Sequence, residues 1–188
     1  MPKATTTAPF PLDFYQSAQA VLDLCRDNQL TLVTAESCTG GMVSGALTAV
    51  PGSSAVIDRG FVTYSNEAKM EMLGVPEELL NTHGAVSPQT ADAMAVGALG
   101  HSPNADVALS ITGIAGPGGG SPDKPVGLVY MAVLLGDQDA MVRRFLFAGS
   151  RAEIRHAAVN AGLDFLLTRI QDGLQDLEEL PVPDETPG

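Results

Sequence analysis

A serine, a cysteine and a threonine lie next to one another in TAESCTGG, residues 34–41, between an apolar run and two glycines. A serine at a helix start ordinarily caps the helix, because its hydroxyl accepts a hydrogen bond from a free backbone N–H. The same N–H groups could instead stabilise an oxyanion, which would make Ser37 a nucleophile. Gly40 and Gly41 count slightly against a simple cap, because glycine weakens a first turn and lets another molecule approach the backbone.

A serine nucleophile needs a base, and histidine is the usual one. The histidines lie near element ends or in a long helix, with no neighbours typical of catalysis: His83, His101 and His156. Lys69 is an alternative, since burial or nearby positive charge can lower the pKa of a lysine until it accepts a proton. A solvated lysine paired with a nearby glutamate is the ordinary interpretation of that position.

Cys38 is a second possible nucleophile, because a helix start would favour its thiolate. Neighbouring side chains on a helix point about 100° apart, so Ser37 and Cys38 cannot both face one substrate. We favour packing as the role of Cys38. A glycine-rich segment, ITGIAGPGGGSPDKP at 111–125, also follows an apolar run. It matches neither a P-loop nor a dinucleotide fingerprint, but a long loop after a buried strand often binds a ligand.

The bulk composition indicates an ordinary globular domain. The chain has 188 residues, 45% of them hydrophobic, and a formal net charge of −12. That charge disfavours nucleic-acid binding, which needs clustered lysine and arginine. Two cysteines form no metal-ligand spacing, and no signal peptide or 18-residue apolar run is present. We therefore expect a cytoplasmic protein that contacts neither membrane nor nucleic acid directly.

Apolar periodicity and turn signals predict the elements that must position these residues. They indicate an α/β fold, in the form of a single three-layer α/β/α domain with a mixed sheet. The domain is expected at 11–172, after a flexible arm at 1–10 and before an acidic mobile tail at 173–188. Strands are predicted at 30–35, 56–65, 106–114, 126–135 and 140–148, the last two as a hairpin. Helices are predicted at 11–28, at 38–50, at 67–73 after an Asn66 cap, from Pro76, at 88–100 after Ser87-Pro88, and from the Ser150-x-x-Glu153 capping box to about Asp172.

Long motifs in a fixed order carry a resemblance to a known family. From about residue 12 to 172 the chain resembles the C-terminal domain of the competence-damage-inducible (CinA) protein family, whose stand-alone form is a nicotinamide-nucleotide amidase. The motifs are TAESCTGG (34–41), GFVTYSNEAKMEMLGV (60–75), GAVSPQTADAMA (84–95), ADVALSITGIAGPGGGSPDKPVG (105–127) and FAGSRAEIR (147–155).

The resemblance implies hydrolysis of the carboxamide of nicotinamide mononucleotide, a small nucleotide substrate, with no metal or other cofactor. It assigns the nucleophile to Ser37, the base to Lys69 and a supporting role to Tyr64. Glu36 is expected to accept a hydrogen bond near the site or to position Lys69. The expected substrate-binding residues are Glu36, Thr39, Gly40, Gly41, Thr112, Gly113, Gly116 and Arg151.

Other interpretations stay open at this point. The chain could be a non-catalytic nucleotide-binding module connected with competence and DNA uptake, with Ser37 only a cap, or an amidase for another small carboxamide. The resemblance also implies a homo-oligomer, a dimer. The metal-dependent amino-terminal domain of longer family members is not expected in this chain.

Overall fold

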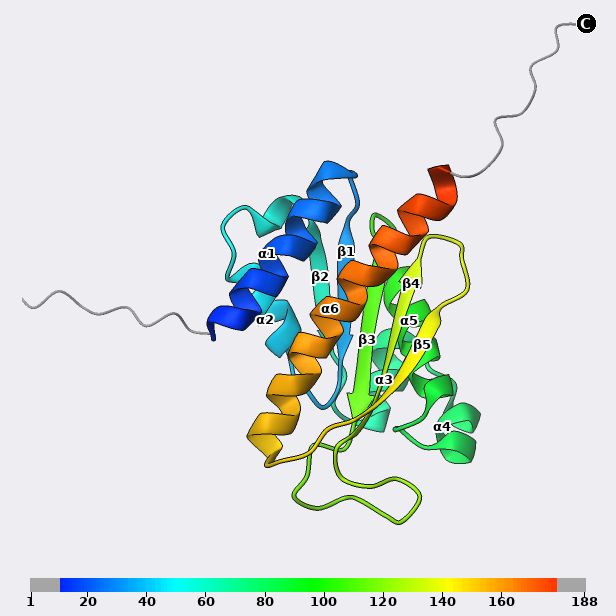
Figure 1. The fold of residues 1–188 in the computed structure, drawn as a ribbon. Coiled ribbons are helices and arrows are strands. Elements are labelled where there is room, and N and C mark those ends of the chain that lie inside the picture. Colours follow the sequence, from blue (N-terminus) through cyan, green and yellow to red (C-terminus); the bar gives the residue numbers. More distant parts are fainter. Residues whose placement is uncertain (1–10, 179–188) are drawn as a thin grey trace, which may run out of the picture.

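The computed structural model describes residues 11–178, in which helices and strands alternate along most of the chain (Figure 1). In chain order the elements are α1 (Leu12–Asp27), β1 (Leu32–Glu36), α2 (Met42–Thr48), the 3₁₀ turn η1 (Ser53–Ala55), β2 (Ile57–Val62), α3 (Asn66–Leu73), α4 (Glu77–His83), α5 (Pro88–Gly100), β3 (Val107–Gly113), β4 (Leu128–Leu135), β5 (Met141–Leu146) and α6 (Arg151–Glu178).

The strands form one mixed sheet in the order β2-β1-β3-β4-β5. β1 runs parallel to β2 and β3, whereas β4 is antiparallel to both β3 and β5. β4 and β5 are the predicted hairpin. The mixed α/β sheet expected from the sequence is therefore confirmed.

Helices cover both faces of the sheet, because its central strands are apolar on both sides. One core lies between the sheet and α1, α2 and α6, where Leu109 and Ile111 of β3 are fully buried. The other lies under α3, α4 and α5, where Ala108 of the same strand packs. Figure 1 shows α1 and α6 on the near face and α5 behind the sheet. This alternation along β3 produces the predicted three layers.

Local sequence signals explain most of the helix ends. Ser87 caps α5 by accepting a hydrogen bond from Thr90 N at 3.1 Å, and Pro88 begins the helix. At the start of α6, Ser150 N donates to Glu153 Oε2 at 2.8 Å, and Glu153 N donates back to Ser150 Oγ at 3.4 Å. The predicted cap and capping box are thus confirmed.

Several predicted boundaries were wrong, and β2 ends at Val62 rather than at residue 65. α2 begins at Met42 rather than at residue 38, because the glycines before it adopt a turn with positive φ. Ser65, not Asn66, caps α3, since its side chain accepts from Ala68 N at 3.0 Å. α6 continues to Glu178, so the acidic tail does not begin at residue 173. The predicted arm at 1–10 and the rest of the tail lie outside the described residues.

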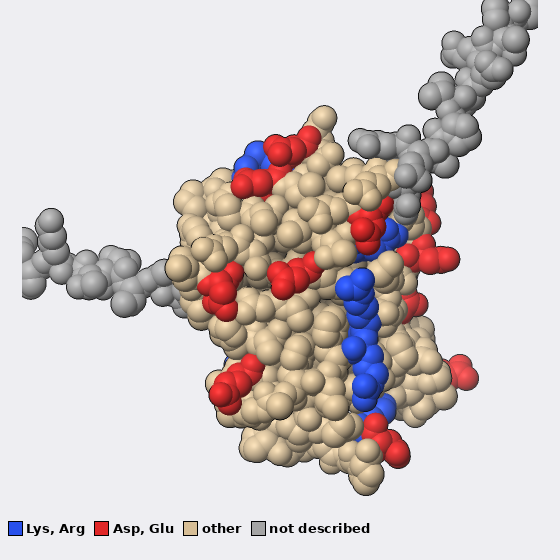
Figure 2. All heavy atoms as spheres, viewed as in Figure 1, with Lys and Arg blue, Asp and Glu red and all other residues tan. Residues whose placement is uncertain are grey.

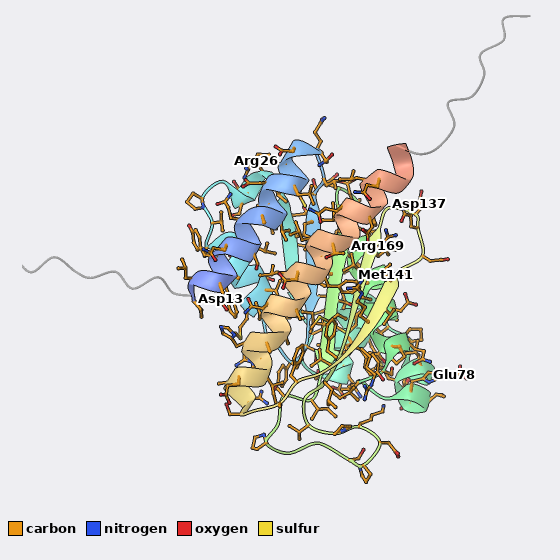
Figure 3. All side chains as sticks on the ribbon, viewed as in Figure 1. Asp13, Arg26, Glu78, Asp137, Met141 and Arg169 are labelled. Carbon is orange, nitrogen blue, oxygen red and sulfur yellow. The ribbon has the colours of Figure 1, made fainter. Side chains whose placement is uncertain are left out.

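α6 is attached to the sheet along much of its length. Near its upper end in Figure 3, Arg169 hydrogen-bonds to Gln138 in the β4–β5 turn. Arg143 of β5 places its guanidinium 4.5 Å from the centre of the Phe165 ring. Figure 2 shows most of the Lys and Arg atoms of this face in a band beside α6, with a separate group at the top of the view, whereas the acidic atoms are scattered. None of the described helices combines the length and the apolar character needed to cross a membrane.

Candidate active site

The candidate site lies where the parallel strands end. Ser37 follows β1, Tyr64 lies two residues after β2, and Gly113 is the last residue of β3. β1 lies between β2 and β3, and the chain reaches these two neighbours through helices on opposite faces, which is the arrangement that leaves a crevice at the carboxyl end of a strand. In Figure 1 this end is at the bottom, with the glycine-rich loop and the start of α6. A cavity of about 190 Å³ opens here, lined by Ser37, Cys38, Tyr64, Lys69, Ala85, Val86, Thr112, Gly113, Ala115 and Arg151.

Lys69 and Ser37 meet in this cavity. Lys69 Nζ lies 3.0 Å from Ser37 Oγ, although the two residues are 32 apart in the sequence. Only 1% of Lys69 and 8% of Ser37 is exposed. Lys69 Nζ also donates to the carbonyl oxygens of Thr63 at 2.8 Å and Ser65 at 3.5 Å. The ordinary interpretation of Lys69 as a solvated, glutamate-paired residue is therefore wrong.

Burial shifts the pKa values of Lys69 and of the neighbouring Cys38. Loss of solvent lowers the pKa of Lys69 to about 8, and the nearby Cys38 only partly opposes the shift. Burial also raises the pKa of the Cys38 thiol to about 11. A helix start was expected to favour the Cys38 thiolate, but its surroundings hold it as a thiol. Of the two candidate nucleophiles, only Ser37 is hydrogen-bonded to Lys69 in the described structure.

The cap of α2 is Glu36 and not Ser37. The Glu36 carboxylate is fully buried and accepts from Gly41 N at 3.0 Å, Val43 N at 3.1 Å and Ser44 N at 2.8 Å. Ser44 Oγ donates a fourth hydrogen bond at 2.8 Å. Glu36 thus satisfies the free N–H groups at this helix start. Glu36 is therefore a hydrogen-bond acceptor beside the site, as one of the two expected alternatives had it, but it does not line the cavity and forms no hydrogen bond with Lys69 among the described residues.

The residues between Ser37 and α2 form a tight turn. Gly40 and Gly41 have φ of 59° and 88°, a backbone that glycine adopts without strain. Gly40 N donates to Ser37 O at 3.0 Å, and Ser37 N donates to Ile111 O at 2.9 Å. Within the described part of the chain, the N–H groups of Cys38 and Thr39 donate to no backbone carbonyl. Both N–H groups follow Ser37 directly in the chain, which makes them candidates for stabilising an oxyanion.

Arg151 and Tyr64 form one wall of the cavity. Arg151 Nη2 donates to the Tyr64 hydroxyl at 2.8 Å, and Arg151 Nη1 donates to Gly116 O at 2.8 Å. Tyr64 is 60% exposed, and its hydroxyl is hydrogen-bonded to Arg151 and not to Ser37 or Lys69 in the described structure. The predicted Gly116 contributes its carbonyl oxygen to this contact. Arg151 thereby links the strand β2 exit, the glycine-rich loop and α6.

The predicted residues divide into two groups. Ser37, Lys69, Tyr64, Thr112, Gly113 and Arg151 line the cavity together. The side chain of Thr112 donates to Ala85 O at 2.6 Å, which ties β3 to the segment before α5. Thr39, Gly40 and Gly41 instead build the turn behind Ser37. Sequence reasoning missed the cavity residues Ala85, Val86 and Ala115, since small apolar residues give no chemical signal.

The alternatives to this site are poorer in chemistry. A larger hollow of about 320 Å³ between α5 and β5 is lined by Pro88, Gln89, Asp92, Asp139, Ala140 and Val142, and offers no nucleophile with a base. No histidine lines the cavity at Ser37, in agreement with the low expectation for them. Within residues 11–178 no group of three or more His, Cys, Asp and Glu side chains is placed to hold a metal ion.

Comparison with known proteins agrees with this fold and these motifs. The model of the CinA C-terminal domain matches residues 15–170. A putative competence-damage inducible protein of Caldicellulosiruptor bescii is 52% identical over 154 residues, which are 82% of this chain and 37% of that protein. A CinA-like protein of Citrifermentans bemidjiense is 53% identical over 150 residues, 78% of this chain and 36% of that protein. The chain thus spans little more than a third of the length of these relatives.

Solved structures match over nearly their whole length. The competence/damage inducible protein CihA from Agrobacterium tumefaciens superposes with a TM-score of 0.83 at 48% identity, covering 86% of this chain and 98% of that one. A CinA superfamily protein from Escherichia coli gives a TM-score of 0.77 at 34% identity, covering 90% of this chain and 99% of that one. The resemblance stated from the motifs is confirmed, and this chain belongs to the CinA C-terminal domain family.

Proposed function

We propose that this chain is an amidohydrolase that converts nicotinamide mononucleotide and water to nicotinic acid mononucleotide and ammonia. The observation that carries the proposal is the buried contact of 3.0 Å between Lys69 Nζ and Ser37 Oγ. A neutral lysine amine has two N–H bonds and one lone pair. The carbonyl oxygens of Thr63 and Ser65 can take the two N–H bonds, which leaves the lone pair for the Ser37 hydroxyl proton.

The reaction follows from this arrangement. Ser37 Oγ attacks the carboxamide carbon as its proton passes to Lys69, and the oxyanion is stabilised by the N–H groups of Cys38 and Thr39. Lys69 then gives the proton to the departing nitrogen, so ammonia leaves and an ester to Ser37 remains. Water attacks this ester, Lys69 takes a proton from the water and returns it to Ser37 Oγ, and the carboxylic acid is released. One water is consumed for each ammonia formed.

The entrance suits a phosphorylated substrate. Among the described residues, Arg151 has no ion pair, and its guanidinium points to a hydroxyl and a carbonyl instead of a carboxylate. A guanidinium in the first turn of a helix opposes the helix dipole, so its position does not serve helix stability. It can bind phosphate oxygens with its remaining N–H bonds. A local cation is what an acidic protein needs for an anionic substrate.

The test is ammonia release from nicotinamide mononucleotide with a chelator present. Ser37→Ala and Lys69→Ala are expected to lose turnover while remaining folded, and Lys69→Ala is expected to have a lower thermal midpoint because it leaves a cavity. Cys38→Ala separates the two candidate nucleophiles and is expected to keep turnover, because it removes the thiol but leaves the backbone N–H of residue 38 and the contact between Ser37 and Lys69. A folded wild type that binds the nucleotide without hydrolysing it would favour the binding-module hypothesis. Turnover of other carboxamides in preference to the mononucleotide would keep the chemistry and change the substrate.

A further inference from the structure

A second arginine, Arg155, lies one helical turn after Arg151 and contacts the turn that follows Ser37. Its Nε donates to Cys38 O at 3.1 Å, and its Nη2 donates to Thr39 O at 2.8 Å. The side chain is half-buried, and no ion pair is formed by it within residues 11–178. The guanidinium fork therefore binds two consecutive backbone carbonyls directly beside the candidate nucleophile.

The contact with Arg155 also fixes the direction of the N–H group in each of the two peptide units whose carbonyl it binds. In a trans peptide unit the C=O and the following N–H point in opposite directions within one plane. Holding Cys38 O thus fixes the direction of the Thr39 N–H, which donates to no backbone carbonyl among the described residues. Holding Thr39 O fixes the Gly40 N–H, which donates to Ser37 O at 3.0 Å. A positive charge at a carbonyl oxygen also polarises that peptide and strengthens its N–H as a donor.

We propose that Arg155 is a positioning residue for the reaction of Ser37, one that holds the Cys38–Thr39 peptide unit so that the Thr39 N–H is directed at the developing oxyanion. This inference rests on the proposed function, since an oxyanion forms only if Ser37 attacks. Arg155 acts through the backbone and does not line the cavity.

Docking of α6 alone does not account for the contact. The neighbouring Ile154, Ala158 and Val159 of α6 are almost fully buried in the core and already hold this part of the helix against the sheet. Gly40 follows with φ of 59°, a conformation that favours glycine, and its backbone lies against the same guanidinium, since a Cβ there would touch Arg155 Nη2 at an ordinary contact distance of 3.5 Å. We therefore attribute to the Arg155 contact a role in holding the conformation of residues 38–40, because α6 is already attached to the sheet by its buried residues.

The test measures the reactivity of Ser37 with a fluorophosphonate probe, together with nicotinamide mononucleotide turnover. In the labelling step Ser37 Oγ bonds to phosphorus, the P–F bond breaks, fluoride leaves and the serine proton passes to Lys69. The rate of labelling is followed by intact mass, with Ser37→Ala as the blank. The variants are Arg155→Met, which keeps an apolar stem, and Arg155→Lys, which keeps the charge but cannot form the planar fork. Arg143→Met is the matched control, because it removes a guanidinium that also packs on α6, at Phe165.

We expect Arg155→Met to be labelled about 10 to 100 times more slowly, since loss of one oxyanion donor costs about 100- to 1000-fold and misalignment costs less. Turnover is expected to fall in kcat by a similar factor, with KM within about twofold, and Arg155→Lys is expected to lie between Arg155→Met and the wild type. Arg143→Met keeps the wild-type rates. If Arg155→Met does not fold, Arg155→Lys alone decides, and it must still be several times slower.

The inference would be overturned if a folded Arg155→Met were labelled at the wild-type rate, or if its effect on turnover were confined to KM. If Arg155→Met does not fold, a folded Arg155→Lys labelled at the wild-type rate would overturn it. So would a wild type whose Ser37 is not labelled. The failure of the proposed function would look different. A wild type that is labelled at Ser37 but does not hydrolyse nicotinamide mononucleotide refutes that substrate, while slower labelling of the Arg155 variants would still support the positioning role.

Discussion

The proton affinity of Lys69 leads to a quantitative prediction for the pH dependence of the reaction. Its pKa of about 8 leaves roughly one tenth of the molecules with a neutral Lys69 at pH 7, and roughly nine tenths at pH 9. Because only the neutral amine can accept the Ser37 proton, kcat/KM is expected to rise about tenfold between these values and to level off above them. The dependence on pH of kcat/KM reports the free enzyme, for which the pKa applies.

The assay is chromatographic quantification of nicotinic acid mononucleotide, which does not depend on the protonation of ammonia. Lys69→Arg is the sharpest variant, since it keeps a long cationic side chain that cannot lose its proton. It is expected to be inactive at every pH from 6 to 10. A wild-type rate that is flat or falls between pH 7 and pH 9, or substantial activity of Lys69→Arg, would refute the role of Lys69 as the base.

The same pKa has a consequence for stability. The folded protein holds the pKa of Lys69 below its ordinary value of 10.5, so the unfolded chain binds more protons at this group between about pH 8 and pH 10.5. The free energy of unfolding therefore rises with pH across this window, by at most about 3 kcal/mol, and this contribution is absent at neutral pH. In urea unfolding, Lys69→Met should lose that rise, and at pH 7 it should be at least as stable as the wild type.

Other variants test the supporting structure. Glu36→Gln places an amide NH₂ against backbone N–H donors, so it should lower the free energy of unfolding by about 2–3 kcal/mol in urea titrations; an unchanged midpoint would show that the cap is dispensable. Gly60→Ala would press its Cβ against Ser44 Oγ and lie 3.0 Å from Thr34 Oγ1, so thermal melts should show a loss of about 1–3 kcal/mol. Arg151→Gln should raise KM for nicotinamide mononucleotide at least tenfold, and it should change the rate with free nicotinamide, a comparison substrate that has no phosphate, by no more than about threefold; equal effects on both substrates would contradict a phosphate contact.

Sequence patterns alone determined much of the fold. Apolar alternation and periodicity of 3.6 depend on neighbours within one element, so they located the strands, most helices and the two caps at Ser87 and Ser150. The family motifs also marked Ser37 and Lys69 as candidates. Patterns could not locate the start of α2, because Gly40 and Gly41 turn the chain first and a carboxylate outside the helix supplies the cap.

Only the tertiary structure decided which polar residues meet. Glu36 and Ser37 are adjacent in the sequence, yet Glu36 accepts hydrogen bonds from the N–H groups of α2 and Ser37 is hydrogen-bonded to Lys69. The two side chains separate because consecutive residues at a strand end point in different directions. The burial that lowers the pKa of Lys69 is also a tertiary effect, since its amine contacts Ser37 and Thr63, which lie outside α3. Arg155 reaches the turn after Ser37 across 117 residues of sequence. Contacts of that range follow from how helices lie on the sheet, and no local spacing encodes them.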